Sequence, residues 1–61
     1  MKRRALLAHL HAHGCVPVRE GSRHSWHRSS ATGALAAVPR HREVVDILAR
    51  KICRELRIPI V

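Results

Sequence analysis

The stretch that decides the fold runs from Cys15 to Arg28 and reads CVPVREGSRHSWHR. Its Val-rich beginning, residues 15–19, predicts a strand, and Pro17, which has no N–H, places that strand at a sheet edge or gives it an irregular start. Glu20-Gly21-Ser22 forms a turn. Residues 23–28 then alternate, with one face carrying His24, Trp26 and Arg28 and the other Arg23, Ser25 and His27. The stretch therefore predicts a basic antiparallel hairpin.

On the N-terminal side of this hairpin, residues 3–13 predict a short helix. Leu6, Leu7 and Leu10 fall at helical spacing, and Gly14 stands where a helix stops. On the C-terminal side, residues 29–33 form a polar loop. Residues 34–38 predict a third strand, which Pro39 ends.

A second helix is expected from about Arg42, and Pro59 stops it. Its buried stripe comprises Val45, Leu48, Ala49, Ile52 and Leu56. The side facing water carries Glu43, Asp46, Arg50, Arg54 and Arg57. The predicted order is α-β-β-β-α, an α+β class in which two helices cover one face of a three-stranded antiparallel sheet and the other face stays open. Residues 1–61 make one domain, because a chain this short supports only one thin core.

The charge distribution favours a polyanionic partner. The net charge is +8, and residues 1–42 carry eight Lys and Arg against the single acid Glu20, whereas residues 43–61 are nearly balanced. A field of this sign attracts polyanions. Arg outnumbers Lys ten to two, and the guanidinium group suits bidentate contacts to phosphate. We expect RNA as the partner.

The cysteines and the N-terminal segment indicate a cytoplasmic location. Cys15 and Cys53 lack a CxxC pairing, which is typical of buried thiols in a reducing compartment. The apolar run of residues 5–8 is broken by His9, too soon for a signal peptide, and nothing approaches the roughly 20 apolar residues of a membrane span. We expect no membrane association.

Three sequence features bear on chemistry. His9 and His13 are neighbours on a helix, but no third ligand is evident, so exposed histidines at a helix end are favoured over a metal site. In Gly21-Ser22-Arg23-His24 a glycine turn lets the backbone approach an anion, Ser and Arg donate to phosphate, and a His can transfer protons near neutral pH. In Val38-Pro39-Arg40-His41 a strand gives way to a helix N-terminus, a common phosphate site. Taken singly, each motif favours a structural interpretation: the first is a basic hairpin with an incidental His, and the second is a simple connection.

Taken together, these pieces resemble the HicA (YcfA-like) family of mRNA interferase toxins. The family's G-S-x-H matches Gly21-Ser22-Arg23-His24, and its V-P-x-H matches Val38-Pro39-Arg40-His41. The leading helix ending at His13-Gly14, the Val16–Arg19 strand and the Leu48–Leu56 helix match as well. The resemblance covers nearly the whole chain. It departs from the family pattern at Ser25-Trp26-His27, in the loop after Arg28, and at the end of the last helix, where Arg57 replaces the usual Gly.

The resemblance implies a double-stranded-RNA-binding-like α-β-β-β-α layer and the activity of a metal-independent endoribonuclease. It places the catalytic histidine at His24. We expect RNA contacts from Gly21, Ser22, Arg23, Arg28, Arg40 and His41, and no cofactor or metal. The implied partners are mRNA and an acidic HicB-like antitoxin of a type II toxin–antitoxin pair.

RNA is cut when its 2′-OH is deprotonated and attacks the neighbouring phosphorus. His24 is expected to move one proton, and His27 and His41 are candidates for the second. The competing hypothesis is a non-catalytic RNA-binding module of the same fold, in which His24 is one more polar contact. A DNA-binding accessory is a third hypothesis, but no helix-turn-helix pair is visible.

Overall fold

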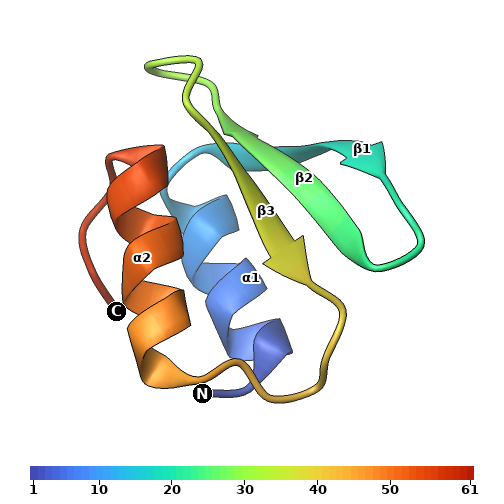
Figure 1. Cartoon of the computed structure of the whole chain (residues 1–61). Coiled ribbons are helices and arrows are strands. Elements are labelled where there is room, and N and C mark those ends of the chain that lie inside the picture. The colour runs from blue at the N-terminus through green and yellow to red at the C-terminus, as the bar shows by residue number, and fades with distance from the viewer.

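The computed structural model describes all 61 residues. Its elements in chain order are α1 (Arg3–Ala12), β1 (Cys15–Glu20), β2 (His24–Ser29), β3 (Leu35–Pro39) and α2 (Asp46–Leu56). The strands form one antiparallel sheet in the order β1-β2-β3. Both helices lie side by side against the same face of this sheet, and its other face is uncovered (Figure 1). The predicted α-β-β-β-α architecture is confirmed, with strand bounds displaced by about one residue.

The core lies between the helices and the inner face of the sheet. Ten buried apolar residues form it: Leu6, Leu10, Cys15, Ala36, Val38, Val44, Ala49, Ile52, Cys53 and Leu56. None of them comes from β2, although β2 is the central strand. The inner face of β2 is polar instead and consists of Ser25, His27 and Ser29, all buried. The alternation predicted for this strand is confirmed, because His24, Trp26 and Arg28 are exposed on the opposite face.

Strand β1 is an edge strand, as Pro17 indicated, and it contains a bulge. Pro17 pairs with His27, and the next pair along the ladder is Arg19 with Trp26, so Val18 is the additional residue. A bulge changes which side chain stands opposite a given residue of the partner strand. Regular pairing would have placed Val18 opposite Trp26; the bulge places Arg19 there.

Helix α2 begins later than predicted, at Asp46 and not at about Arg42. The preceding residues pair with the N-terminus: Arg3 N–H donates to Arg42 O at 2.7 Å, and Val44 N–H donates to Met1 O at 2.8 Å. These bonds hold the backbone extended and compete with a helix. Val45 was predicted to be buried, but it is the residue before the helix and is 69 % exposed. Glu43, predicted on the helix, lies in a bridge with Lys2.

Both helices are followed by a residue in the left-handed conformation, a glycine after α1 and an arginine after α2. After α1, Gly14 adopts a φ of +78°, which glycine tolerates without strain. After α2, Arg57 takes the same left-handed region with φ 59°, at the position where the sequence lacks a glycine.

With 11 residues in its longer helix, the chain has no helix of the length and apolarity needed to cross a membrane.

Candidate functional site

The two sequence motifs meet in space because β2 and β3 are antiparallel neighbours. His24, the first residue of β2, pairs with Pro39, the last residue of β3. Residues on both sides of this pair surround a hollow of about 460 Å³, lined by Ser22, Arg23, His24, Pro39, Arg40 and His41. Five of the seven predicted site residues therefore line one surface feature. No apolar side chain other than Pro39 contributes, so the hollow is polar and suited to a hydrated, charged ligand.

Gly21 shapes the turn beside the hollow but does not line it. Its N–H donates to the carbonyl oxygen of His24 at 2.8 Å. A Cβ at this position would lie 3.1 Å from that same oxygen, which is closer than side chains normally pack. The turn therefore needs glycine for a close approach to His24. Our expectation that the Gly21 backbone binds an anion needs correction, because its N–H is already used.

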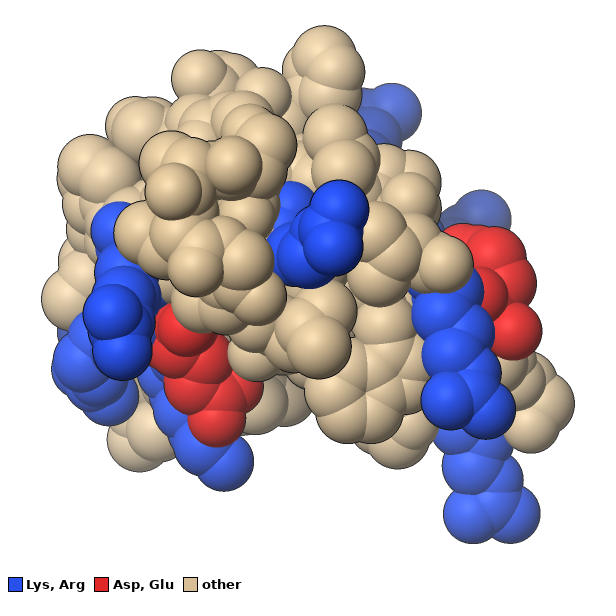
Figure 2. Space-filling view, turned by 90° about the horizontal axis from the view of Figure 1, so that it is seen from above, with Lys and Arg blue, Asp and Glu red and all other residues tan.

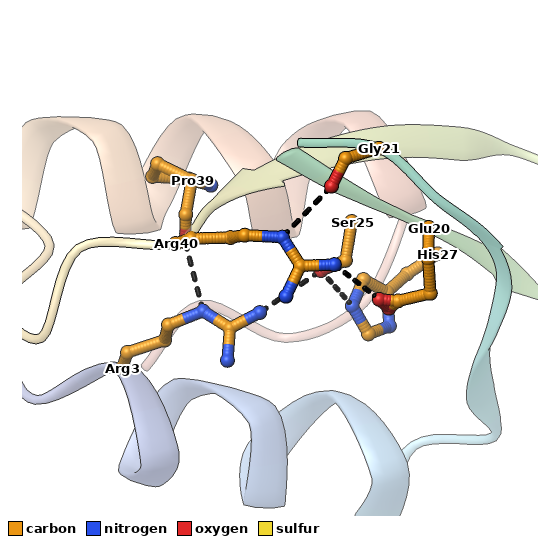
Figure 3. Close-up of polar contacts among 7 residues, drawn as sticks. All are labelled: Arg3, Glu20, Gly21, Ser25, His27, Pro39 and Arg40. Atoms are coloured by element: carbon orange, nitrogen blue, oxygen red, sulfur yellow. Dashed lines mark hydrogen bonds and ion pairs between the residues drawn. The ribbon is translucent and has the colours of Figure 1, made fainter. Parts of the chain in front are cut away.

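Arg40 lines the hollow and bonds to residues at and just after the end of β1. Its Nε donates to Gly21 O at 2.9 Å, and its Nη2 lies 2.6 Å from Glu20 Oε2 (Figure 3). The backbone N–H of Arg40 also donates to Arg23 O at 3.2 Å. An ion pair this exposed adds little stability. The ion pair does partly neutralise Arg40 and hold its side chain in place. Arg40 in turn positions the turn at Glu20-Gly21. Sequence reasoning missed Glu20 as its partner.

His24, Arg23 and His41 are exposed at the hollow, each able to reach a ligand from solvent. Two imidazoles in one hollow supply one group that can accept a proton and one that can donate a proton. The Arg23 guanidinium adds positive charge to the same hollow. The arrangement contains the groups that proton transfer at a phosphodiester requires.

His27 lies on the other side of β2 from His24 and does not belong to this hollow. Its side chain is buried, and its Nε2 lies 3.0 Å from Ser25 Oγ. Burial lowers the pKa of His27 below its ordinary value of 6.5, and the charge of Arg3 lowers it further. The hypothesis that His27 transfers the second proton is therefore wrong in this structure: the ring cannot reach a ligand bound beside His24.

Arg28 also lies away from the hollow. It is four residues beyond His24 on the same face of β2, which corresponds to about 13 Å along a strand. It belongs to the uncovered face of the sheet. A ligand that touches both His24 and Arg28 must extend along β2.

A second basic hollow, of about 730 Å³, adjoins the first. Its lining consists of Lys2, Arg3, Arg4, Arg40, Arg42 and Glu43, and Arg40 lines both hollows. The charge run at residues 2–4 was visible in the sequence, but only the packing of α1 brings it beside the end of β3. Seen from above, Lys and Arg gather at two sides of the molecule, and each acidic patch lies against basic residues (Figure 2).

Arg3 connects this second hollow to the sheet. Its Nε donates to Pro39 O at 2.8 Å, and its Nη2 donates to Ser25 Oγ at 3.0 Å (Figure 3). Ser25 in turn contacts His27, so a polar chain runs from the start of α1 through the inner face of β2. Nδ1 of His27 is buried without a hydrogen-bond partner. Through the bond from Arg3 to Pro39 O, these polar contacts attach the end of β3 to the start of α1.

His9 of α1 and His13, which follows that helix, make other contacts. Nε2 of His9 lies 2.6 Å from Pro59 O, Nδ1 of His13 lies 2.9 Å from His9 O, and the two rings are 4.5 Å apart. No group of three or more His, Cys, Asp or Glu side chains is arranged to hold a metal ion. His9 therefore anchors the C-terminal segment to α1.

Comparison with known proteins adds no relative: no family model matches the chain, and neither a curated protein nor a solved structure matches it.

Proposed function

We propose that this protein is a metal-independent endoribonuclease, an mRNA interferase toxin of the HicA type. The observation that carries the proposal is the exposure of His24, Arg23 and His41 in one polar hollow at the paired ends of β2 and β3. The excess of positive charge supports a polyanionic substrate. The resemblance of both motifs to those of HicA proteins supports RNA cleavage as the reaction.

In the proposed mechanism His24 removes the proton of a ribose 2′-OH. The 2′ oxygen forms a bond to the adjacent phosphorus, and the bond from phosphorus to the 5′ oxygen breaks. The leaving 5′ oxygen receives a proton from His41, the second imidazole of the hollow. The products are a 2′,3′-cyclic phosphate and a free 5′-OH. One such proton transfer is typically worth about 10²–10⁴ in rate.

Positive charge lowers the barrier by stabilising the crowded phosphate. Arg23 is the free cation of the hollow, and Arg40 contributes less because Glu20 holds it. The dependence on the 2′-OH means that DNA is not cut. Ser22 adds a hydroxyl donor at the rim.

A non-catalytic RNA-binding module is the second candidate function. The second hollow favours it, because five cations line that surface and no histidine does. Such a surface binds phosphates and performs no proton transfer. In this alternative His24 is only a polar contact.

An acidic HicB-like antitoxin is the proposed protein partner. Charge complementarity would bring it over the basic surface and across His24, which blocks the substrate and speeds association. Both proteins would then act in the cytoplasm, where mRNA is the target.

The test is cleavage of a labelled single-stranded RNA in excess EDTA, with the products analysed for a cyclic phosphate end. We expect cleavage by the wild type and none by His24→Ala, with thermal unfolding of the variant unchanged. His11→Ala is the matched control, since His11 is exposed on α1 away from the hollow. Cleavage by His24→Ala, or a strict need for added Mg²⁺, would contradict the proposal. RNA binding without any cleavage by the wild type would favour the binding module.

A further inference from the structure

The uncovered face of the sheet, called the open face below, carries an aromatic residue between cations. Trp26 is at its centre on β2 and is 40 % exposed. Opposite Trp26 stand Arg19 on β1 and Ala37 on β3. Arg28 lies two residues further along β2 and is flanked by Val16 and Leu35. The helices leave this face free, so Trp26 takes no part in the core.

The bulge in β1 creates the pairing of Arg19 with Trp26. Without it, Val18 would stand beside the indole and the centre of the face would be apolar. With it, Arg19 is the register partner of Trp26. The residue on the other side is Ala37, which is too small to cover an aromatic ring. The bulge therefore changes the register partner of Trp26 from an apolar residue to an arginine, and Trp26 is 40 % exposed.

The charges of this face match one kind of ligand. None of the four acids lies on it: Glu20 pairs in register with Ser25, an inner-face residue, and is held by Arg40. Glu43 and Asp46 lie at the N-terminal amine, and Glu55 is on α2. An acid-free surface with an aromatic ring between two arginines suits a nucleobase on the ring and phosphates at the guanidinium groups.

We propose that Trp26 stacks on a base of single-stranded RNA, with Arg19 and Arg28 contacting the flanking phosphates. The inference rests on the proposed RNA substrate and adds that the bound RNA is single-stranded at Trp26. A base in a duplex has both faces covered by its neighbours, so only an unpaired base can lie on Trp26. The open face selects single-stranded RNA.

The open face continues directly into the candidate active site. His24, Trp26 and Arg28 are successive outward residues of β2, spaced about 7 Å apart. That spacing is comparable with the distance between consecutive phosphates of an extended strand. A base stacked on Trp26 therefore brings the next nucleotide to His24.

The fluorescence of Trp26 reports on this contact directly, because the chain has one Trp and no Tyr. The probe is a short 2′-O-methyl oligoadenylate, which cannot be cleaved through the 2′ oxygen, labelled for anisotropy. An abasic strand of equal length and charge and a self-complementary duplex are the controls. We expect strong quenching by the oligoadenylate and almost none by either control, although anisotropy shows all three binding.

Variants provide the second measurement. Trp26→Ala is expected to weaken oligoadenylate binding roughly 5- to 150-fold and to leave binding of the abasic strand unchanged, whereas Trp26→Phe keeps most of the affinity. Leu35→Ala, an apolar truncation on the same face, is the matched control and should have little effect. Thermal unfolding of each variant separates loss of stacking from loss of fold.

The outcomes separate this inference from the proposed function. Quenching without cleavage of ordinary RNA supports stacking and counts against the nuclease. Cleavage and binding without quenching overturn stacking and leave the nuclease standing; the open face would then serve a protein partner. Absence of oligoadenylate binding by anisotropy overturns stacking, and only together with absence of cleavage of ordinary RNA does it overturn both proposals. Equal quenching by the abasic strand also overturns stacking.

Discussion

Arg40 and Glu20, 20 residues apart in sequence, form an ion pair with 2.6 Å between Nη2 and Oε2. The pair joins the residue after β3 to the last residue of β1, and Arg40 also lines the hollow that contains His24. It places the only acid of residues 1–42 beside the proposed phosphate site. Glu20 therefore both orients Arg40 and opposes the binding of an anion.

Replacing Glu20 with Gln is expected to tighten RNA binding. The change removes one negative charge near the phosphate and leaves the bond from Arg40 Nε to Gly21 O in place. Two like charges about 4 Å apart in water repel by about 1 kcal/mol, so removing the charge of Glu20 corresponds to roughly a fivefold gain in affinity for the phosphate. The measurement is anisotropy titration at low salt. Glu55→Gln, an equal charge change on α2, is the control. An equal gain in both variants would show that net charge alone is responsible.

The stability of the fold is expected to fall as the pH drops below about 6.5, the ordinary pKa of histidine. Because burial lowers the pKa of His27 in the folded protein, the unfolded state binds more protons between the two pKa values. His27 thus contributes its full stability above pH 6.5 and loses it as the pH falls toward the lowered folded pKa. The slope from one such group is at most about 1.4 kcal/mol per pH unit.

Urea unfolding from about pH 7.5 to about pH 5 measures this dependence. His27→Gln should flatten the curve even if it lowers overall stability, because no buried imidazole remains to be charged. His11→Gln, a change at an exposed imidazole, should keep the wild-type slope. A slope that persists in His27→Gln would show that another group is responsible.

Replacing Arg57 with Gly is expected to stabilise the protein. Arg57 holds a φ of 59° after α2, a conformation that costs a side-chain-bearing residue about 1 kcal/mol or more. Relief of that cost should raise the midpoint of thermal unfolding by about 4–8 °C. Arg54→Gly, within α2, removes the same side chain and should destabilise by about 1 kcal/mol. A lower midpoint for Arg57→Gly would mean that the arginine side chain makes a stabilising contact there.

The two thiols are expected to react slowly with Ellman's reagent in the folded protein. Cys15 and Cys53 are both buried, and burial raises the pKa of the Cys15 thiol above its ordinary value, with the neighbouring Cys53 adding to the rise. Reaction requires exposure of a thiolate, so it should wait for unfolding and become rapid in urea. A rapid reaction of either thiol in native buffer would contradict the burial.

The two faces of β2 could be predicted because successive side chains of a strand point to opposite faces of the sheet. The start of α2 could not. Val44 and Val45 continue the apolar pattern of that helix, but the backbone around them bonds to Met1 and Arg3, more than 35 residues away in sequence. Local periodicity cannot reveal a pairing between residues so far apart. The pairing keeps residues 42–45 out of the helix despite their helical pattern.

The residues of the candidate site could be chosen from their sequence motifs, but the contacts around them could not be predicted. Antiparallel order places the end of β3 beside the start of β2, so the proximity of His24 to Arg40 follows from the topology. The Glu20–Arg40 pair depends on where β1 ends, and the neighbour of Trp26 depends on which residue of β1 is bulged. Pro17 indicated an irregular edge, but not that Val18 would be displaced and Arg19 paired.

The second hollow is expected to supply phosphate contacts that salt can compete away. Each charge neutralised on a single strand contributes about −0.7 to the slope of log affinity against log salt concentration. Arg4→Gln combined with Arg42→Gln should therefore make the slope shallower by about 1.4, measured by anisotropy between about 50 and 200 mM salt. Both side chains are exposed and line the hollow, so the fold should be unaffected. Arg50→Gln with Lys51→Gln removes the same charge from exposed positions of α2. If that pair flattens the slope equally, the RNA is held by the overall field of the protein, and the hollow has no special part in binding.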